Sequence, residues 1–137
     1  MNKIFQDVLY AQRFLASAGL YHGLLDGRYG SMTKAAEDNF ELTYNTIKSQ
    51  LGTFDVRSEQ NISTLLPKTQ ILARKFMKLA SKASFTTKII SGTRTYAEQN
   101  VLYNQRNPRV TKAPGGHSNH NFGLAWDVGI FVNNEYY

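Results

Sequence analysis

The most informative segment of the chain reads Gly115-Gly116-His117-Ser118-Asn119-His120-Asn121-Phe122-Gly123-Leu124-Ala125-Trp126-Asp127. After its glycine-rich start, the residues from 124 to 132 alternate in hydropathy, which predicts a strand with two distinct faces. One face carries the residues expected to join the core: Trp126, Val128, Ile130 and Val132. Asp127 lies on the other face between Ala125 and Gly129, whose small side chains leave space for a metal or a substrate.

His120 and Asp127 are candidate ligands for zinc, because neutral imidazole and carboxylate both bind this metal well. A loop that folds back brings His120 to the same side of the sheet as Asp127. The sequence contains no cysteine, so thiolate ligands and a cysteine nucleophile are excluded. A His and an Asp at this spacing often occur by chance, so the spacing alone leaves metal binding open.

Working outward, the segment 85–90 is rich in β-branched and aromatic residues and predicts a second strand, which ends at Ser91-Gly92. Thr95 and Glu98 have the spacing of a capping box that opens a short helix. Arg94 therefore lies at a strand-to-helix junction, where polar groups often meet a ligand. Pro67 suits the first turn of a preceding helix.

The front of the chain is helical. Apolar residues from Ile4 to Ala18 follow helical spacing, a glycine-rich loop spans 19–30, and Ser31 opens a second helix that runs through Ile47. The stretch from Leu51 to Leu66 lacks a sustained period. The predicted fold class is α+β, with a helical module at 1–52, a linker at 53–66, and helices on a small antiparallel sheet at 67–137.

The chain has 137 residues and a net charge of +6, which favours a polyanionic partner. Nucleic acid is disfavoured because the basic residues are dispersed. We interpret the densest group as a solvated helix face: Lys68, Arg74, Lys75, Lys78 and Lys82. The sequence shows no signal-peptide core and no membrane span, so we expect synthesis in the cytoplasm without a secretion signal.

The pattern Ser118-x-His120-x-x-Gly123-x-Ala125-x-Asp127 resembles the signature of the M15 zinc peptidases. This family includes D-Ala-D-Ala carboxypeptidases, VanY-type enzymes and phage L-alanyl-D-glutamate endopeptidases. Further similar segments stand upstream in the family's order: Ser91 to Thr95, Glu98-Gln99, Leu102-Tyr103 and Gln105-Arg106. The resemblance implies hydrolysis of peptidoglycan stem peptides by a zinc-activated water.

Carried over residue by residue, the resemblance implies that His120 and Asp127 are zinc ligands. It implies that Arg94 polarises the scissile carbonyl or holds a substrate carboxylate, and that Ser118 and Gln99 bind substrate. A guanidinium suits its task because it stays charged and offers a planar fork of donors.

The front of the chain is similar to a three-helix peptidoglycan-binding module that often precedes such peptidases. The matching residues are Gln12, Leu15, Gly19, Tyr21, Gly23, Asp26, Gly27, Tyr29, Gly30, Thr33, Ala36 and Phe40. Peptidoglycan is therefore the expected partner, and the arrangement suggests a phage endolysin that reaches the wall after release from the cytoplasm.

The family pattern also requires a third zinc ligand, a downstream histidine, with an acidic general base shortly before it. Neither follows Asp127 in the sequence given. A fragment, a natural truncation or completion by a partner chain would each explain this. We therefore expect little peptidase activity from these residues alone, and the alternative function is that of a non-catalytic peptidoglycan-binding protein.

Overall fold

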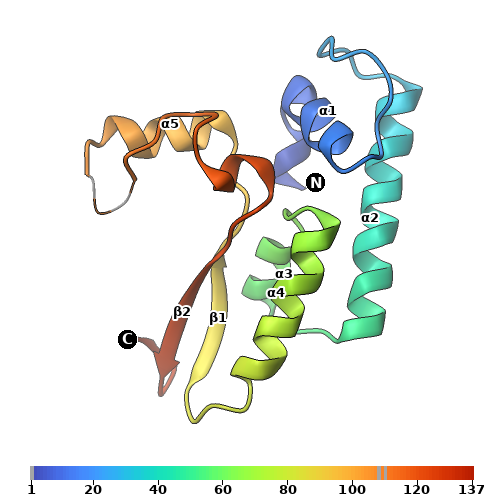
Figure 1. Cartoon of the computed structure of the whole chain (residues 1–137). Coiled ribbons are helices and arrows are strands. Elements are labelled where there is room, and N and C mark those ends of the chain that lie inside the picture. The colour runs from blue at the N-terminus through green and yellow to red at the C-terminus, as the bar shows by residue number, and fades with distance from the viewer. Residues whose placement is uncertain (1, 108, 110) are drawn as a thin grey trace.

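A computed structural model describes residues 2–107, 109 and 111–137. These residues form five α-helices, two short 3-10 helices and a three-stranded sheet (Figure 1), so the predicted combination of helices with a small antiparallel sheet is confirmed. In chain order the elements are η1 (Lys3–Phe5), α1 (Val8–Ser17), α2 (Ser31–Leu51), α3 (Val56–Ile62), α4 (Pro67–Ala80), β1 (Thr86–Ser91), α5 (Tyr96–Asn104), η2 (Asn119–Phe122), β2 (Asp127–Val132) and β3 (Glu135–Tyr136). No helix among the described residues is long and apolar enough to cross a membrane.

The sheet has the order β1-β2-β3, and both pairs are antiparallel. Ile89 pairs with Val128, and an irregularity after Ile89 brings Ser91 opposite Asp127. The register therefore places the end of β1 beside the start of β2. Figure 1 shows these two strands next to α3 and α4, with the long helix α2 on the far side of that helix pair.

The front helices share an aromatic core. The rings of Phe14 and Phe40 meet edge to face with centroids 5.5 Å apart, and Phe5 meets Phe40 in the same way at 5.7 Å. Gln12 is fully buried and organises the glycine-rich loop, since its Oε1 accepts the backbone N–H groups of Asp26 and Gly27. The loop therefore takes its shape from a buried amide on α1.

The segment 53–66, in which the sequence shows no sustained period, contains the short helix α3. Asp55 caps the helix by accepting from the backbone N–H of Ser58 at 3.0 Å. The Ser58 hydroxyl accepts from the Ile89 N–H at 2.9 Å, and the Asn61 amide donates to the Ile89 carbonyl at 2.8 Å. Helix α3 thus satisfies backbone groups on the outer side of the edge strand β1.

The interpretation of the basic residues around α4 as a solvated face is wrong for Arg74, which is fully buried. Its guanidinium makes two bonds of 2.8 Å to the carboxylate of Glu59 and one of 2.8 Å to the Gly52 carbonyl. The same carboxylate accepts from the Tyr44 hydroxyl at 2.7 Å. This buried ion pair joins α2, α3 and α4.

Strand β2 alternates as predicted, but its burial differs from the prediction. Val128, Ile130 and Val132 are 38–45% exposed, whereas Gly129 and Phe131 are buried. The reason is that α3 and α4 lie against β1, so that β2 is one strand farther from them. On the face of Asp127, the space beside Gly129 is filled, because a Cβ on Gly129 would lie 2.6 Å from the Tyr136 ring.

Candidate active site

His120 lies on η2, whose start is fixed by a reciprocal cap. The Ser118 hydroxyl accepts from the His120 N–H at 3.2 Å, and the Asn121 amide oxygen accepts from the Ser118 N–H at 3.2 Å. The His120 ring points its Nδ1 at the Gly92 carbonyl, 2.9 Å away. Because a carbonyl only accepts, Nδ1 carries a proton there, and in the neutral ring the lone pair stands at Nε2.

Asp127 opens β2 and receives three side chains at one oxygen. The Ser91 hydroxyl donates to its Oδ2 at 2.6 Å, Arg94 Nη2 lies 3.4 Å from the same atom, and His120 Nε2 also lies 3.4 Å from it. The Asp127 side chain is 49% exposed, whereas those of His120 and Arg94 are 13% and 17% exposed. The carboxylate is therefore the open end of an otherwise enclosed group.

Arg94 is held at both its backbone and its side chain. Its N–H donates to the His120 carbonyl at 2.8 Å, and its own carbonyl accepts from the Asn121 amide at 2.9 Å. Its Nη1 donates to Gln99 Oε1 at 3.2 Å. The loop that carries Arg94 and the loop that carries His120 are therefore connected directly.

Gln99 lies on α5 and is fully buried. While its oxygen accepts from Arg94, its Nε2 donates to the Thr111 hydroxyl at 2.8 Å and to the Ala113 carbonyl at 2.7 Å. Every hydrogen-bonding group of this amide except one lone pair is occupied. The geometry makes Gln99 a support for the Arg94 guanidinium.

The spacing of the His120 and Asp127 donors fits two corners of a zinc site. In a tetrahedral site with bonds of about 2.0–2.1 Å, two ligand atoms lie roughly 3.3–3.4 Å apart. The observed separation of Nε2 and Oδ2 is 3.4 Å. Among the described residues, however, no group of three His, Cys, Asp or Glu side chains could hold a metal. His120 and Asp127 are thus two candidate ligands, and the exposed His117 belongs to no group of three.

Of the five predicted site residues, the structure brings Arg94, His120 and Asp127 together, places Gln99 behind Arg94, and places Ser118 at the backbone of His120. Sequence reasoning missed two contributors. Ser91 reaches Asp127, which the antiparallel pairing of the two predicted strands would have indicated. Tyr10 donates its hydroxyl to the Asn121 carbonyl at 2.7 Å, and no local pattern indicates this contact across 111 residues.

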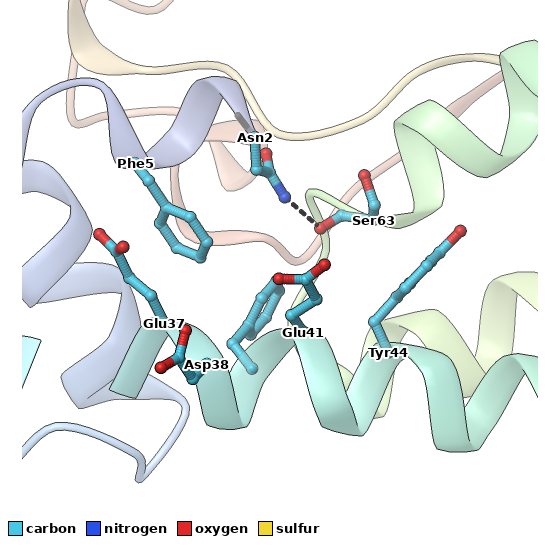
Figure 2. A pocket seen from close by; sticks show the side chains of 8 residues that line it. Asn2, Phe5, Glu37, Asp38, Glu41, Tyr44 and Ser63 are labelled. Carbon is cyan, nitrogen blue, oxygen red and sulfur yellow. Dashed lines mark hydrogen bonds between the residues drawn. The ribbon is translucent and has the colours of Figure 1, made fainter. Parts of the chain in front are cut away.

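A pocket of about 370 Å³ lies away from this site, between η1, α2 and the end of α3. Figure 2 shows its lining, with the Asn2 amide donating to the Ser63 carbonyl and acidic side chains along α2. Burial raises the pKa of one of these carboxyls, Glu37, although the Tyr29 hydroxyl acts in the opposite direction. None of the five predicted site residues lines this pocket, so its chemistry is separate from that of Asp127.

The comparison with protein-family models matches residues 63–135 to VanY, D-alanyl-D-alanine carboxypeptidase. No solved structure matches the chain. The match includes β1, α5, η2 and β2, and therefore every element that carries a residue of the site. Since it covers more than half of the sequence, the chain belongs to the VanY family of peptidoglycan-directed peptidases.

Proposed function

We propose that the chain serves zinc-dependent hydrolysis of stem peptides in bacterial peptidoglycan, in the manner of an endolysin or a VanY-type carboxypeptidase. The observation that carries the proposal is the meeting of His120 Nε2 and Asp127 Oδ2 at 3.4 Å, with Arg94 at the same carboxylate. In this proposal His120 and Asp127 hold the metal, which when bound supplies Lewis-acid activation of water and of the scissile carbonyl.

The protein's own groups have distinct tasks in this proposal. The Gly92 carbonyl keeps the proton of His120 on Nδ1, so that Nε2 is free for a ligand bond. Arg94 is the donor to the carbonyl oxygen or to a substrate carboxylate, and Gln99 acts on substrate through Arg94 by fixing its guanidinium. Ser118 keeps one hydroxyl hydrogen that a substrate carbonyl can accept, although its oxygen already caps η2.

We further propose that residues 1–52 form a peptidoglycan-binding module, that 53–66 connect it, and that 67–137 belong to the peptidase. The support is the resemblance of the glycine-rich loop, together with the net charge of +6, which favours an anionic polymer. In the structure the connecting segment is itself part of the packing, through α3.

The test of the metal site is zinc titration of the whole chain, followed by calorimetry and by elemental analysis after dialysis. We expect one weakly held zinc, because the described residues offer two ligands. His120→Ala or Asp127→Ala should weaken binding by at least about tenfold. His117→Ala is the matched control and should leave it unchanged. Equal zinc binding by the His120 and His117 variants would remove the basis of the proposal.

The second candidate function is non-catalytic binding to peptidoglycan, and it is favoured by the shortage of metal ligands among the described residues. Incubation with purified insoluble peptidoglycan separates the two. Retention on the pellet without release of stem-peptide fragments, with or without added zinc, supports the binding protein. Zinc-dependent release by these 137 residues supports the peptidase and contradicts the expectation of low activity.

A further inference from the structure

A pocket of about 390 Å³ adjoins the candidate active site, and we call it the Lys3–Glu98 pocket. Ser91 and Arg94, which both reach Asp127, form the wall toward the site. Val101 and Leu102 on α5 supply an apolar wall. The volume lies within the usual range for small-molecule sites, and apolar walls with a few polar groups are typical of them.

Two opposite charges stand in this pocket. Lys3 Nζ lies 3.2 Å from Glu98 Oε2, with the two side chains 40% and 45% exposed. An exposed ion pair of this kind contributes little to the stability of the fold. Each of the two side chains can therefore leave this ion pair and bind an oppositely charged group of a ligand at little cost in free energy.

The two charges are nevertheless held in place. Asn2, next to Lys3, donates to the Ser63 carbonyl at 2.8 Å, which fixes the start of the chain against α3. Glu98 Oε1 accepts from the Thr95 N–H at 3.0 Å in the capping box of α5. Burial alone would raise the pKa of Glu98. The Thr95 N–H and the Lys3 ammonium together have the larger effect and lower the pKa below its usual value, so the carboxyl group is ionised.

Lys3 lies outside the segment that matches the family, which begins at residue 63. Its charge is thus brought to the edge of the candidate active site by the front of the chain. A cation from one part of the sequence and an anion from another form a pair that suits a ligand with both charges.

We infer that the Lys3–Glu98 pocket binds a stem-peptide side chain that ends in both a free ammonium and a free carboxylate. Lys3 receives the carboxylate, Glu98 receives the ammonium, and Val101 and Leu102 contact the methylene groups between that end and the peptide. This inference rests on the proposed action on stem peptides and adds to it the class of peptide that is preferred.

The experiment measures binding of two fluorescent synthetic stem peptides to the whole chain by anisotropy, without added zinc. The peptides are identical except that the third residue is diaminopimelate in one and lysine in the other, which lacks the terminal carboxylate. We expect the first to bind about tenfold more tightly, as charge-assisted hydrogen bonds allow.

Three variants and one control complete the design. Lys3→Met should abolish the preference, and Lys3→Arg should keep it. Glu98→Gln should weaken binding of both peptides, since each ends in an ammonium, while glutamine still completes the capping box. Lys34→Met, which breaks a surface pair of 2.8 Å with Asp38 on α2, is the matched control and should change nothing. Thermal melting of each variant confirms that it is folded.

The possible failures are distinguishable. If both peptides bind equally well, or if the preference survives in Lys3→Met, the inference is overturned while the proposed function stands. If neither peptide binds to the chain and peptidoglycan does not retain it, the proposed function fails, and the inference fails with it.

Discussion

Gly123 ends η2 in the left-handed region, with a φ of 71°. A Cβ at this position would lie 2.8 Å from the Phe14 ring and 2.9 Å from the Leu66 backbone nitrogen. The Gly123 carbonyl also accepts from the Leu66 N–H at 3.2 Å. The glycine of the His-x-x-Gly pattern is thus required by packing against α1 and the start of α4.

Gly123→Ala should therefore lower the free energy of unfolding by about 2–4 kcal/mol, from the left-handed backbone and the overpacking together. Gly19→Ala is a matched control, because Gly19 has a φ of 76° and no atom within 4 Å of its added Cβ. Gly19→Ala should lower the free energy of unfolding only by the cost of the left-handed backbone, about 1–2 kcal/mol. Chemical denaturation measures both, and equal losses would show that the close packing costs nothing.

At the scale of residues, the sequence identified the polar members of the site and not all of their partners. His120, Asp127 and Arg94 stand in a recognisable pattern, and the Thr95–Glu98 capping box was predicted from its spacing and is present. Arg74 could not be interpreted in the same way, because its partner Glu59 lies 15 residues away on another helix. Only the tertiary fold reveals that this cation is buried.

Among the elements, α1 has a role beyond its own core. The hydroxyl of Tyr10 donates to the Asn121 carbonyl at 2.7 Å and lies 3.3 Å from the Arg94 carbonyl, which can share the same proton. Burial raises the pKa of this phenol, with smaller contributions from Tyr96 and Glu98, so it remains a donor at neutral pH. A helix at the front of the chain therefore supports both loops of the candidate active site.

Tyr10→Phe removes this hydroxyl and keeps the ring. We expect a loss of about 1 kcal/mol in stability, together with faster amide exchange at the Arg94 N–H, which bonds the His120 carbonyl. Tyr21→Phe is the matched control, because it loses a similar buried hydroxyl that bonds the Leu24 carbonyl in the glycine-rich loop. Unchanged exchange at Arg94 in Tyr10→Phe would mean that α1 does not support the loops.

Helix α3 shows why the sequence did not predict every element. It has seven residues, and isolated helices of that length are unstable in water. Its stability comes from the Asp55 cap and from contacts of Ser58 and Asn61 with Ile89 on β1. The longer helix α4 is predictable because its signal is local: Pro67 occupies its first turn, and its apolar residues follow helical spacing.

For the whole molecule, the Glu59–Arg74 pair connects three helices and makes stability depend on pH. Burial alone would raise the pKa of Glu59, but bonds from Arg74, the Phe54 N–H and Tyr44 lower it below its usual value of 4.5. A carboxyl with a lowered pKa stabilises the fold above its unfolded pKa. This contribution is lost as the pH falls through the folded value.

We therefore expect the melting temperature to decrease as the pH is lowered below about 4.5. We also expect Glu59→Gln to be less stable at pH 7 and its melting temperature to depend less on pH in the acidic range. Glu37→Gln is the control of opposite sign, because the pKa of Glu37 is raised and its ionisation opposes folding. Melting curves from pH 3 to pH 7 provide the comparison. An unchanged acid dependence in Glu59→Gln would show that other carboxyls dominate.

The contacts of Tyr10 and Phe14 with the segment around Gly123 have a practical meaning for protein engineering. In this chain, a chimera that replaces residues 1–52 loses a hydrogen bond to the loops of the candidate active site and uncovers Gly123. A graft that keeps α1 and exchanges only what lies beyond it avoids both losses.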